Sequence, residues 1–177
     1  AWWLSQTKSP TKPIFETITA LPLVLPPSVL GFYILVALSV NSPIGVFFEE
    51  VFDIQLVFNF TGLVVASCFY SLPFMVQPLQ NGFESLNKNM LEASYISGKS
   101  KFETLIKVAL PNIKPALITA IIITFAHTVG EFGVVLMVGG SIPGETKVAS
   151  VAIYEMVEIM DYSAAHIYSA IMLAMSF

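Results

Sequence analysis

Apolar stretches long enough to cross a membrane alternate with polar segments along most of this chain. A transmembrane helix needs about 20 predominantly apolar residues. The pattern predicts one transmembrane domain over residues 1–177, with complete spans at about 18–40, 56–76 and 113–138 and a partial span at 165–177.

The apolar pattern is incomplete at both ends of the chain. Trp2 and Trp3 are typical of the interface end of an earlier span, because tryptophan favours the membrane–water boundary. The apolar stretch 165–177 stops without a polar flank. We therefore expect that a first span is missing and that the last span is truncated.

Lysines fall almost entirely on one side of the predicted membrane. Each complete span reverses the side, so the segments 5–16 and 77–112 lie together, opposite the loops 41–55 and 139–164. Counting Lys114, the first side carries seven lysines and the second carries one. Loops rich in lysine and arginine stay in the cytoplasm. The loop 77–112 is therefore predicted to be cytoplasmic.

Three prolines interrupt the first half of the first complete span, at Pro22, Pro26 and Pro27. Such breaks are tolerated in a membrane where the freed backbone groups face protein or a water-filled path. Two compatible interpretations stay open. The helix starts late after an irregular segment, or an unwound segment lies beside a pore.

Composition supports a membrane protein and excludes several other classes. Hydrophobic residues make up 55% of the chain and charged residues 11%, whereas a soluble domain carries about a quarter charged residues. The predicted fold class is an all-α polytopic membrane protein. A net charge of −4 and the absence of arginine argue against nucleic acid as a partner. The single cysteine, Cys68, allows neither an internal disulfide nor a thiolate cluster, and we expect no metal and no cofactor.

Two short helices are predicted within the cytoplasmic loop. The segment Met90–Ser97 has small residues on one face, and Gly98 can end it in a left-handed conformation. Ser100 and Glu103 have the spacing of a capping box, which starts a second helix.

The tripeptide Gly98-Lys99-Ser100 looks like the tail of a phosphate-binding P-loop, but its context is wrong. The first glycine of that motif would fall at Ala93, and no strand precedes it. The chain itself is therefore not expected to hydrolyse ATP.

The same loop resembles the EAA loop of ABC importer permeases. That pattern has Glu-Ala-Ala, three residues, glycine, nine residues, then an aliphatic residue, any residue and Leu-Pro. Ser94 takes the place of the second alanine. The candidate residues for coupling to an ATPase are Glu92, Ala93, Ser94, Gly98, Val108, Leu110 and Pro111. The alternative is that this loop is an ordinary amphipathic linker between spans, with no coupling role.

Three further stretches look like the permeases of molybdate importers. They are Leu21–Gly31, Gly130–Gly133 and Ile142–Thr146. The related sulfate and tungstate permeases share much of the last two. The proline-rich first stretch favours molybdate, with tungstate or sulfate as alternatives.

This resemblance implies the helical bundle of a type I ABC importer permease in a bacterial inner membrane. It also implies a second copy of the permease, a cytoplasmic ATP-binding subunit, an external substrate-binding protein and a path along the dimer axis. A dianionic oxyanion is usually held by arginine or by helix N-termini. The absence of arginine fits a weak path lined by hydroxyl and amide groups, with selectivity set by the binding protein. It fits a different substrate equally well.

His127 and Glu131 are the charged candidates inside the third span. Their four-residue spacing predicts that they share one helix face. At 1.5 Å per residue, Glu131 would lie about 24 Å from Pro115, near the outer surface. The pair either fixes helix packing or lies at the outer mouth of the pathway. A metal site lacks a third ligand.

Two other classes compete with the importer interpretation. An ion-coupled secondary transporter would need no ATPase, and it offers no reason for the spacing of the loop motif. An intramembrane enzyme built on His127 and Glu131 would need a nucleophile or a complete metal shell.

Overall fold

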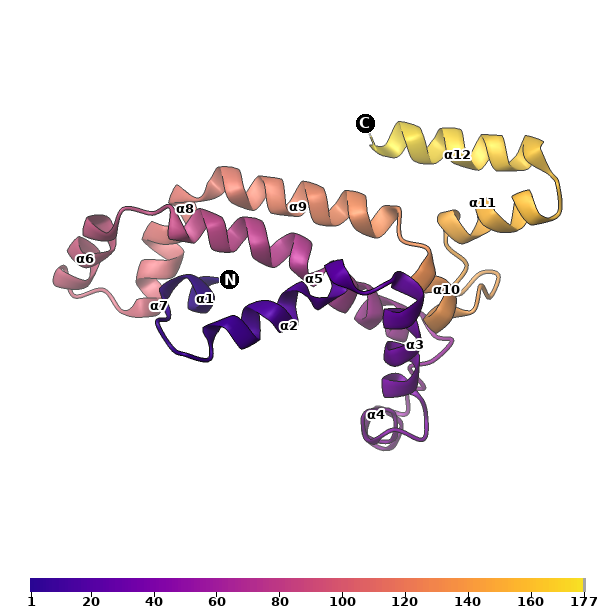
Figure 1. Ribbon diagram of the computed structural model, residues 1–177, viewed down its shortest axis with the longest axis horizontal. Helices are drawn as coiled ribbons and strands as arrows, with labels where there is room; N and C mark the ends of the chain where they lie inside the picture. The colour runs from indigo at the N-terminus through magenta and orange to yellow at the C-terminus, as the bar shows by residue number, and fades with distance from the viewer. Residues whose placement is uncertain (177) are drawn as a thin grey trace. The chain divides into compact units, whose positions relative to one another are not determined.

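The computed structural model describes residues 1–176, and every regular element in that range is a helix (Figure 1). The predicted all-α fold class is confirmed. The helices, including one π-helical turn named η1, are α1 (Trp2–Gln6), α2 (Lys12–Val24), α3 (Pro27–Leu38), α4 (Pro43–Phe52), α5 (Phe60–Glu84), α6 (Lys88–Ile96), α7 (Lys101–Thr104), η1 (Leu105–Ala109), α8 (Leu110–Asn112), α9 (Lys114–Val129), α10 (Gly133–Gly139), α11 (Ala149–Glu158) and α12 (Tyr162–Ser176).

The chain forms two compact units. The first unit comprises Ala1–Leu21 and Leu72–Phe125, and the second comprises Pro22–Ser71 and the residues from Ala126 onward. Each unit is therefore built from two separate stretches of the chain, and each has its own apolar core.

The core of the first unit gathers around Phe83, near the end of α5. Phe83, Leu91, Ala109 and Ile113 are buried together. The ring of Trp2 meets the ring of Phe83 edge-on, with the centroids 5.0 Å apart. Apolar contacts thus hold α1, α5, α6 and the start of α9 in one cluster.

Polar contacts add to this core between α2 and α5. The ammonium of Lys12 lies 3.1 Å from the carboxylate of Glu84. The amide of Gln80 donates to Glu16 over 2.6 Å. These contacts fix the polar start of α2 against the polar end of α5.

The second unit packs α3 against α10. Its main core consists of the buried residues Leu38, Leu56, Val57, Ala66, Val134 and Val138. Gly31 permits the close approach, because a Cβ there would lie 3.0 Å from the Cβ of Met137 and 3.1 Å from the Cα of Val134. A second buried cluster joins Leu63, Val135 and Val151.

Helix α5 alone among the described helices is long and apolar enough to cross a membrane by itself. Two bent pairs also pass that test if each is counted as one span, namely α2 with α3 and Lys101–Asn112 with α9. Helix α5 continues through Pro73 and Pro78 to Glu84, beyond the expected end at residue 76. The loop predicted to begin at residue 77 therefore starts with the last two turns of a helix.

The prolines break the first predicted span into two helices. Helix α2 already begins at Lys12 and includes Pro22, so the interpretation as a late-starting helix is wrong. The break falls at Leu25 and Pro26, and Pro27 opens α3. Proline is well suited to that first position, because its missing N–H has no partner there in any helix.

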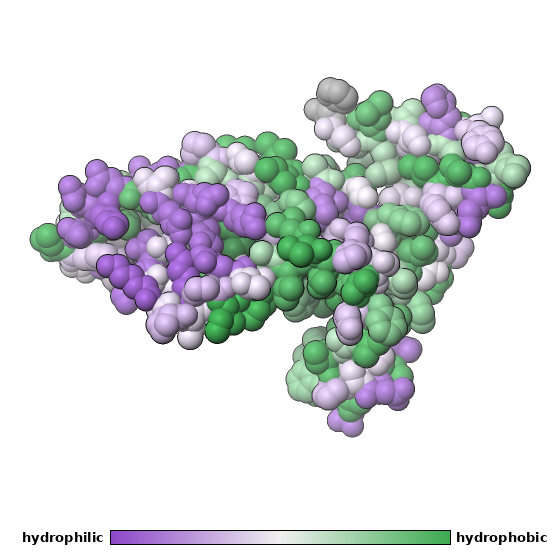
Figure 2. Space-filling view, viewed as in Figure 1, coloured by the Kyte–Doolittle hydropathy of each residue, from purple (hydrophilic) through white to green (hydrophobic). Residues whose placement is uncertain are grey.

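Large apolar side chains are exposed along the predicted spans. On α9, Ile118, Ile121, Ile122 and Phe125 are between 46% and 60% exposed. On the face drawn in Figure 2, hydrophilic residues gather over α1, α6 and α7. A helix that crosses lipid needs apolar side chains on its exposed surface, with the polar residues gathered outside the span.

We predict that Gly62→Ala destabilises the second unit. A Cβ at Gly62 would lie 1.7 Å from the backbone oxygen of Leu56, which is itself buried, so the backbone must move. Overpacking of this kind costs about 1–3 kcal/mol. The melting temperature of the purified protein in detergent should fall clearly. Gly130→Ala is the control, since nothing lies within 3.5 Å of its added Cβ; equal melting of both variants would contradict the prediction.

Candidate functional site

The first arm of the cytoplasmic loop is helix α6. The Asn87 side chain caps it by accepting from the backbone N–H of Asn89 over 2.9 Å. Just beyond the helix, Gly98 has a φ of +79°, and a Cβ there would meet no atom within 4 Å. The predicted ending of this helix by a left-handed glycine is confirmed, and its cause is the backbone angle rather than crowding.

The second arm begins with the predicted capping box. The hydroxyl of Ser100 accepts from the N–H of Glu103, and the Glu103 carboxylate accepts from the N–H of Ser100, each over 3.2 Å. Lys107 lies 3.0 Å from the same carboxylate. The Lys107 ammonium, together with the Ser100 N–H, lowers the pKa of Glu103.

The second arm then widens into the π-helical turn η1, which the sequence did not predict. Helix α8 follows, with Pro111 at its start. Proline offers no N–H to the carbonyl four residues earlier, here that of Lys107, and its ring crowds that carbonyl. A wider turn relieves both problems, and such turns are frequent at functional sites.

A buried hydrogen bond joins the two arms. The hydroxyl groups of Ser94 on α6 and Thr104 on α7 lie 2.9 Å apart. Ser94 is 6% exposed and Thr104 is fully buried. Thr104 belongs to no motif, and sequence reasoning missed it. The serine that replaces the alanine of the EAA pattern thus has a partner in this chain.

The motif residues divide into an exposed and a packed set. Glu92, Ala93, Gly98 and Pro111 are exposed, whereas Ser94 is buried and Val108 and Leu110 are partly buried. Next to the exposed set, Ile96 is 87% and Phe102 72% exposed. Ile106 on the same loop is 46% exposed as well, so the loop presents several apolar side chains to its surroundings, which is typical of a protein contact surface.

In the second unit, the candidate residues His127 and Glu131 lie at a break between two helices. Helix α9 ends at Val129 and α10 begins at Gly133. The prediction that His127 and Glu131 share one helix face is therefore wrong, because Glu131 lies outside the helix. A glycine on each side of the Glu-Phe pair weakens helix continuity at this point.

Glu131 is held within the protein at this break. It is 4% exposed, with the side chain of Ser67 on α5 near its carboxylate, but neither carboxylate oxygen has a hydrogen-bond partner of good geometry within residues 1–176. Its backbone oxygen accepts from the hydroxyl of Ser150 on α11. The break is thus tied to two neighbouring helices.

A cavity of about 600 Å³ opens beside the break. The ring of His127 lies 4.7 Å from that of Tyr70, measured between centroids. Ser28, Tyr70, His127 and Glu131 all line the cavity, so the structure brings the two predicted residues to one site. Within residues 1–176, no three His, Cys, Asp or Glu side chains gather as a metal site would require.

Comparison with known proteins places these features in a family. A family model described as "Binding-protein-dependent transport system inner membrane component" matches residues 2–177. The molybdenum transport system permease protein ModB of Azotobacter vinelandii is 49% identical over 177 residues, covering 100% of this chain and 78% of that protein.

Sulfate permeases are also similar to this chain. The sulfate transport system permease protein CysT of Salmonella typhimurium is 34% identical over 176 residues, which are 99% of this chain and 63% of that protein. The putative molybdenum permease YvgM of Bacillus subtilis is 36% identical over 152 residues, covering 86% of this chain and 67% of that protein. The chain thus spans less than two thirds of the length of the Salmonella sulfate permease.

These matches confirm the predicted resemblance to ABC importer permeases. They identify a transport component rather than an enzyme. The chain belongs to the family of binding-protein-dependent transport system inner membrane components.

Proposed function

We propose that this chain is the permease subunit of an ATP-driven importer that carries molybdate into the cytoplasm across a bacterial inner membrane. The observation that carries the cargo assignment is the 49% identity, over the whole chain, to a molybdenum permease. The EAA-like motif between Glu92 and Pro111 supports the assignment of ATP as the energy source.

The exposed part of the loop fits a contact with a separate ATPase. Ile96 and Phe102 are the most exposed large apolar residues of the loop, and Glu92 and Ala93 are exposed on the same helix as Ile96. Burying bare apolar surface stabilises a complex by about 25 cal/mol per Å². The seven motif residues then share two roles: the exposed ones meet the partner, and the packed ones hold the loop.

The packed part of the loop fits a rigid lever. The bond between Ser94 and Thr104 fixes α6 against α7, and the capping box holds the turn after Gly98. The segment Lys101–Asn112 meets α9 at an angle of 79°. Movement of α6 by a nucleotide-driven partner would therefore be transmitted to α9 rather than absorbed by a flexible linker.

The break at Glu131 fits a point on the substrate path. Non-helical backbone at membrane depth is tolerated where it lines a cavity, and ionisable groups there are often functional. The hydroxyl groups of Ser28 and Tyr70 and the imidazole of His127 offer polar contacts in the cavity. We place this cavity toward the outer end of the path. Its few donors fit weak binding, with selectivity supplied by an external binding protein.

The complete importer contains partners that this chain requires. They are a second copy of the permease, a cytoplasmic ATP-binding subunit and an external substrate-binding protein. The match to a binding-protein-dependent family supports this composition. Sulfate is the second candidate cargo, because the Salmonella sulfate permease is 34% identical over 99% of this chain.

The first test concerns coupling. Gly98→Pro should abolish uptake while leaving membrane insertion intact, because proline cannot adopt the φ of +79° found there. Gly98→Asn is the matched control, since asparagine tolerates that region, and it should retain most of the uptake. Radiolabelled molybdate uptake in cells that express the complete importer measures both. Full uptake by Gly98→Pro would refute the coupling role.

Charge at the exposed face of α6 is tested in the same assay. Glu92→Lys should abolish uptake, because it reverses the charge on the proposed contact surface. Glu49→Lys changes a glutamate on α4 that is also exposed, and it serves as the control for surface charge reversal. If the two variants transport equally well, Glu92 does not face the ATPase.

The hydroxyl pair is tested by a double replacement. Ser94→Ala leaves the buried Thr104 hydroxyl without this partner, which costs about 1–3 kcal/mol. The ratio of molybdate transported to ATP hydrolysed should fall in reconstituted vesicles. Adding Thr104→Val removes the orphaned hydroxyl and should restore much of the ratio. If Ser94→Ala leaves the ratio of transport to hydrolysis unchanged, the bond between Ser94 and Thr104 is not needed for coupling.

The cargo is tested by competition. Excess unlabelled tungstate should compete strongly with radiolabelled molybdate for uptake by the complete system, since the two oxyanions match in size and charge. Excess sulfate should compete weakly. Strong competition by sulfate would overturn the molybdate assignment and favour the second candidate.

A further inference from the structure

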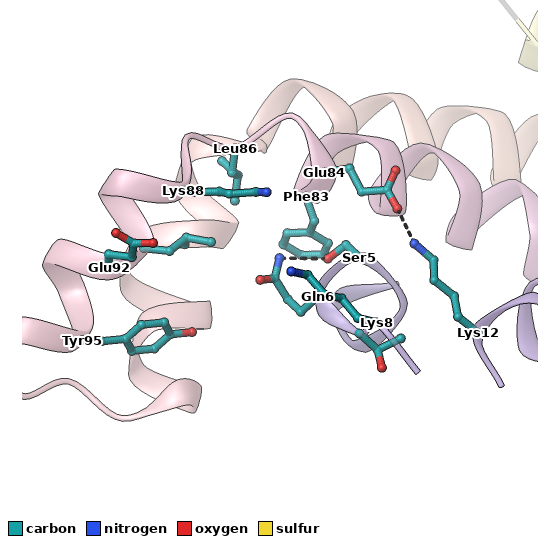
Figure 3. A pocket seen from close by; sticks show the side chains of 12 residues that line it. Ser5, Gln6, Lys8, Lys12, Phe83, Glu84, Leu86, Lys88, Glu92 and Tyr95 are labelled. Atoms are coloured by element: carbon teal, nitrogen blue, oxygen red, sulfur yellow. Dashed lines mark hydrogen bonds and ion pairs between the residues drawn. The ribbon is translucent and has the colours of Figure 1, made fainter. Parts of the chain in front are cut away.

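The first unit contains a hollow of about 570 Å³ whose lining residues, apart from Glu92, have no part in the transport cycle proposed above. It lies between the segment joining α1 to α2, the end of α5 and helix α6. Its lining residues are Ser5, Gln6, Thr7, Lys8, Lys12, Phe83, Glu84, Leu86, Lys88, Leu91, Glu92 and Tyr95 (Figure 3).

Two of the three lysines in the hollow are not neutralised. Lys12 lies 3.1 Å from Glu84 and 3.6 Å from Glu16, so its charge is compensated. Among the residues that the structure describes, Lys8 and Lys88 form no ion pair. With Glu92 as the remaining unpaired acid of the lining, the hollow keeps one net positive charge.

The two lysines approach the same place from different parts of the chain. Lys88 extends from α6 and Lys8 from the segment after α1, and both reach toward the ring of Phe83 (Figure 3). A single exposed lysine is usually just solvated. Two converging ammonium groups over a buried aromatic ring are unusual, because like charges repel unless something lies between them.

Neutral donors complete the arrangement. The Tyr95 hydroxyl and the Gln6 amide line the same hollow. The amide of Gln6 also donates to the hydroxyl of Ser5 over 3.3 Å, which holds it at the rim. Ammonium, hydroxyl and amide groups around one space are the donors that a tetrahedral oxyanion accepts from.

We propose that this hollow binds a phosphate-class oxyanion, in the form of the phosphodiester headgroup of an anionic lipid. The lysine distribution that puts the loop 77–112 in the cytoplasm puts the hollow at the inner leaflet, where anionic headgroups attract basic pockets. Trp2, whose ring contacts Phe83, and the exposed Trp3 have the chemistry of residues at that interface. The volume exceeds that of a bare oxyanion and leaves room for a glycerol group.

A bound headgroup would touch the helix that carries the coupling motif. Glu92 and Tyr95 of α6 line the hollow, and Lys88 opens the same helix. The occupant therefore bridges α6 to α1 and α5, and the lipid composition of the inner leaflet would influence how firmly α6 is held. This step rests on the proposed function, but the binding itself does not.

The test measures equilibrium binding to the purified, delipidated complex of the full-length permease and its ATPase. Dioctanoyl phosphatidylglycerol is the anionic probe, and dioctanoyl phosphatidylcholine, inorganic phosphate and molybdate are compared with it. The double variant Lys8→Gln/Lys88→Gln should weaken phosphatidylglycerol binding about 25-fold, from about fivefold for each lysine near the surface. The double variant Lys99→Gln/Lys114→Gln removes the same charge outside the hollow and should bind as the unaltered complex does.

The outcomes distinguish a lipid headgroup from a free oxyanion as the ligand, or show that the hollow is not a specific site. Lysine-dependent binding of phosphatidylglycerol, with little binding of phosphate or molybdate, supports the headgroup. Free phosphate or molybdate that binds with the same dependence on Lys8 and Lys88 and displaces the lipid supports a site for soluble oxyanions instead. Equal binding of the two lipids, or equal loss in both double variants, overturns the proposal. Uptake is not measured, so failure here leaves the transport assignment untouched.

Discussion

The loop depends on one buried hydrogen bond, between the hydroxyl groups of Ser94 and Thr104. A hydroxyl buried without a partner is costly, so the bond favours the single arrangement of α6 and α7 in which both are satisfied. Gly98 lets the chain reverse direction between them, and Leu91 and Ala109 pack beside the contact in the same core. The contact between α6 and α7 therefore lies inside the protein rather than on its surface, which is what the proposed lever requires.

The rest of the structure depends on where helices are allowed to end inside a membrane. Proline breaks the chain at Pro26, and glycines flank the break at Glu131. At the second break the freed backbone finds a partner locally, because the Ser150 hydroxyl bonds the Glu131 carbonyl, whereas neither oxygen of the buried Glu131 carboxylate has a hydrogen-bond partner among the described residues. At the Glu131 break, a neighbouring helix thus supplies the backbone partner that the interrupted helix lacks.

Local patterns in the sequence predicted the local features well. The capping box was predictable because Ser100 and Glu103 are three residues apart and satisfy each other. Gly98 was predictable because few other residues take its φ. The partner of Ser94 was not, since Thr104 reaches it only after a turn and a helix start whose packing no motif describes. The end of α9 at Val129 was missed for a related reason: Gly130 permits a break without requiring one, and tertiary contacts decide.

The two features that the sequence did not predict, the partner of Ser94 and the end of α9, lie where function is proposed. Sequence patterns that agree at every level specify regular helices, and places where they disagree are expected at functional or strained sites. The breaks at Pro26 and at Glu131 both interrupt spans that their apolar pattern would continue, and the π-helical turn η1 lies in the loop just before the third span. A transporter needs such interruptions, because a bundle of uninterrupted apolar helices offers a polar oxyanion neither hydrogen-bond partners nor room. The irregular positions are therefore the ones that the proposed passage of a charged cargo would require, whereas the regular ones follow from lipid alone.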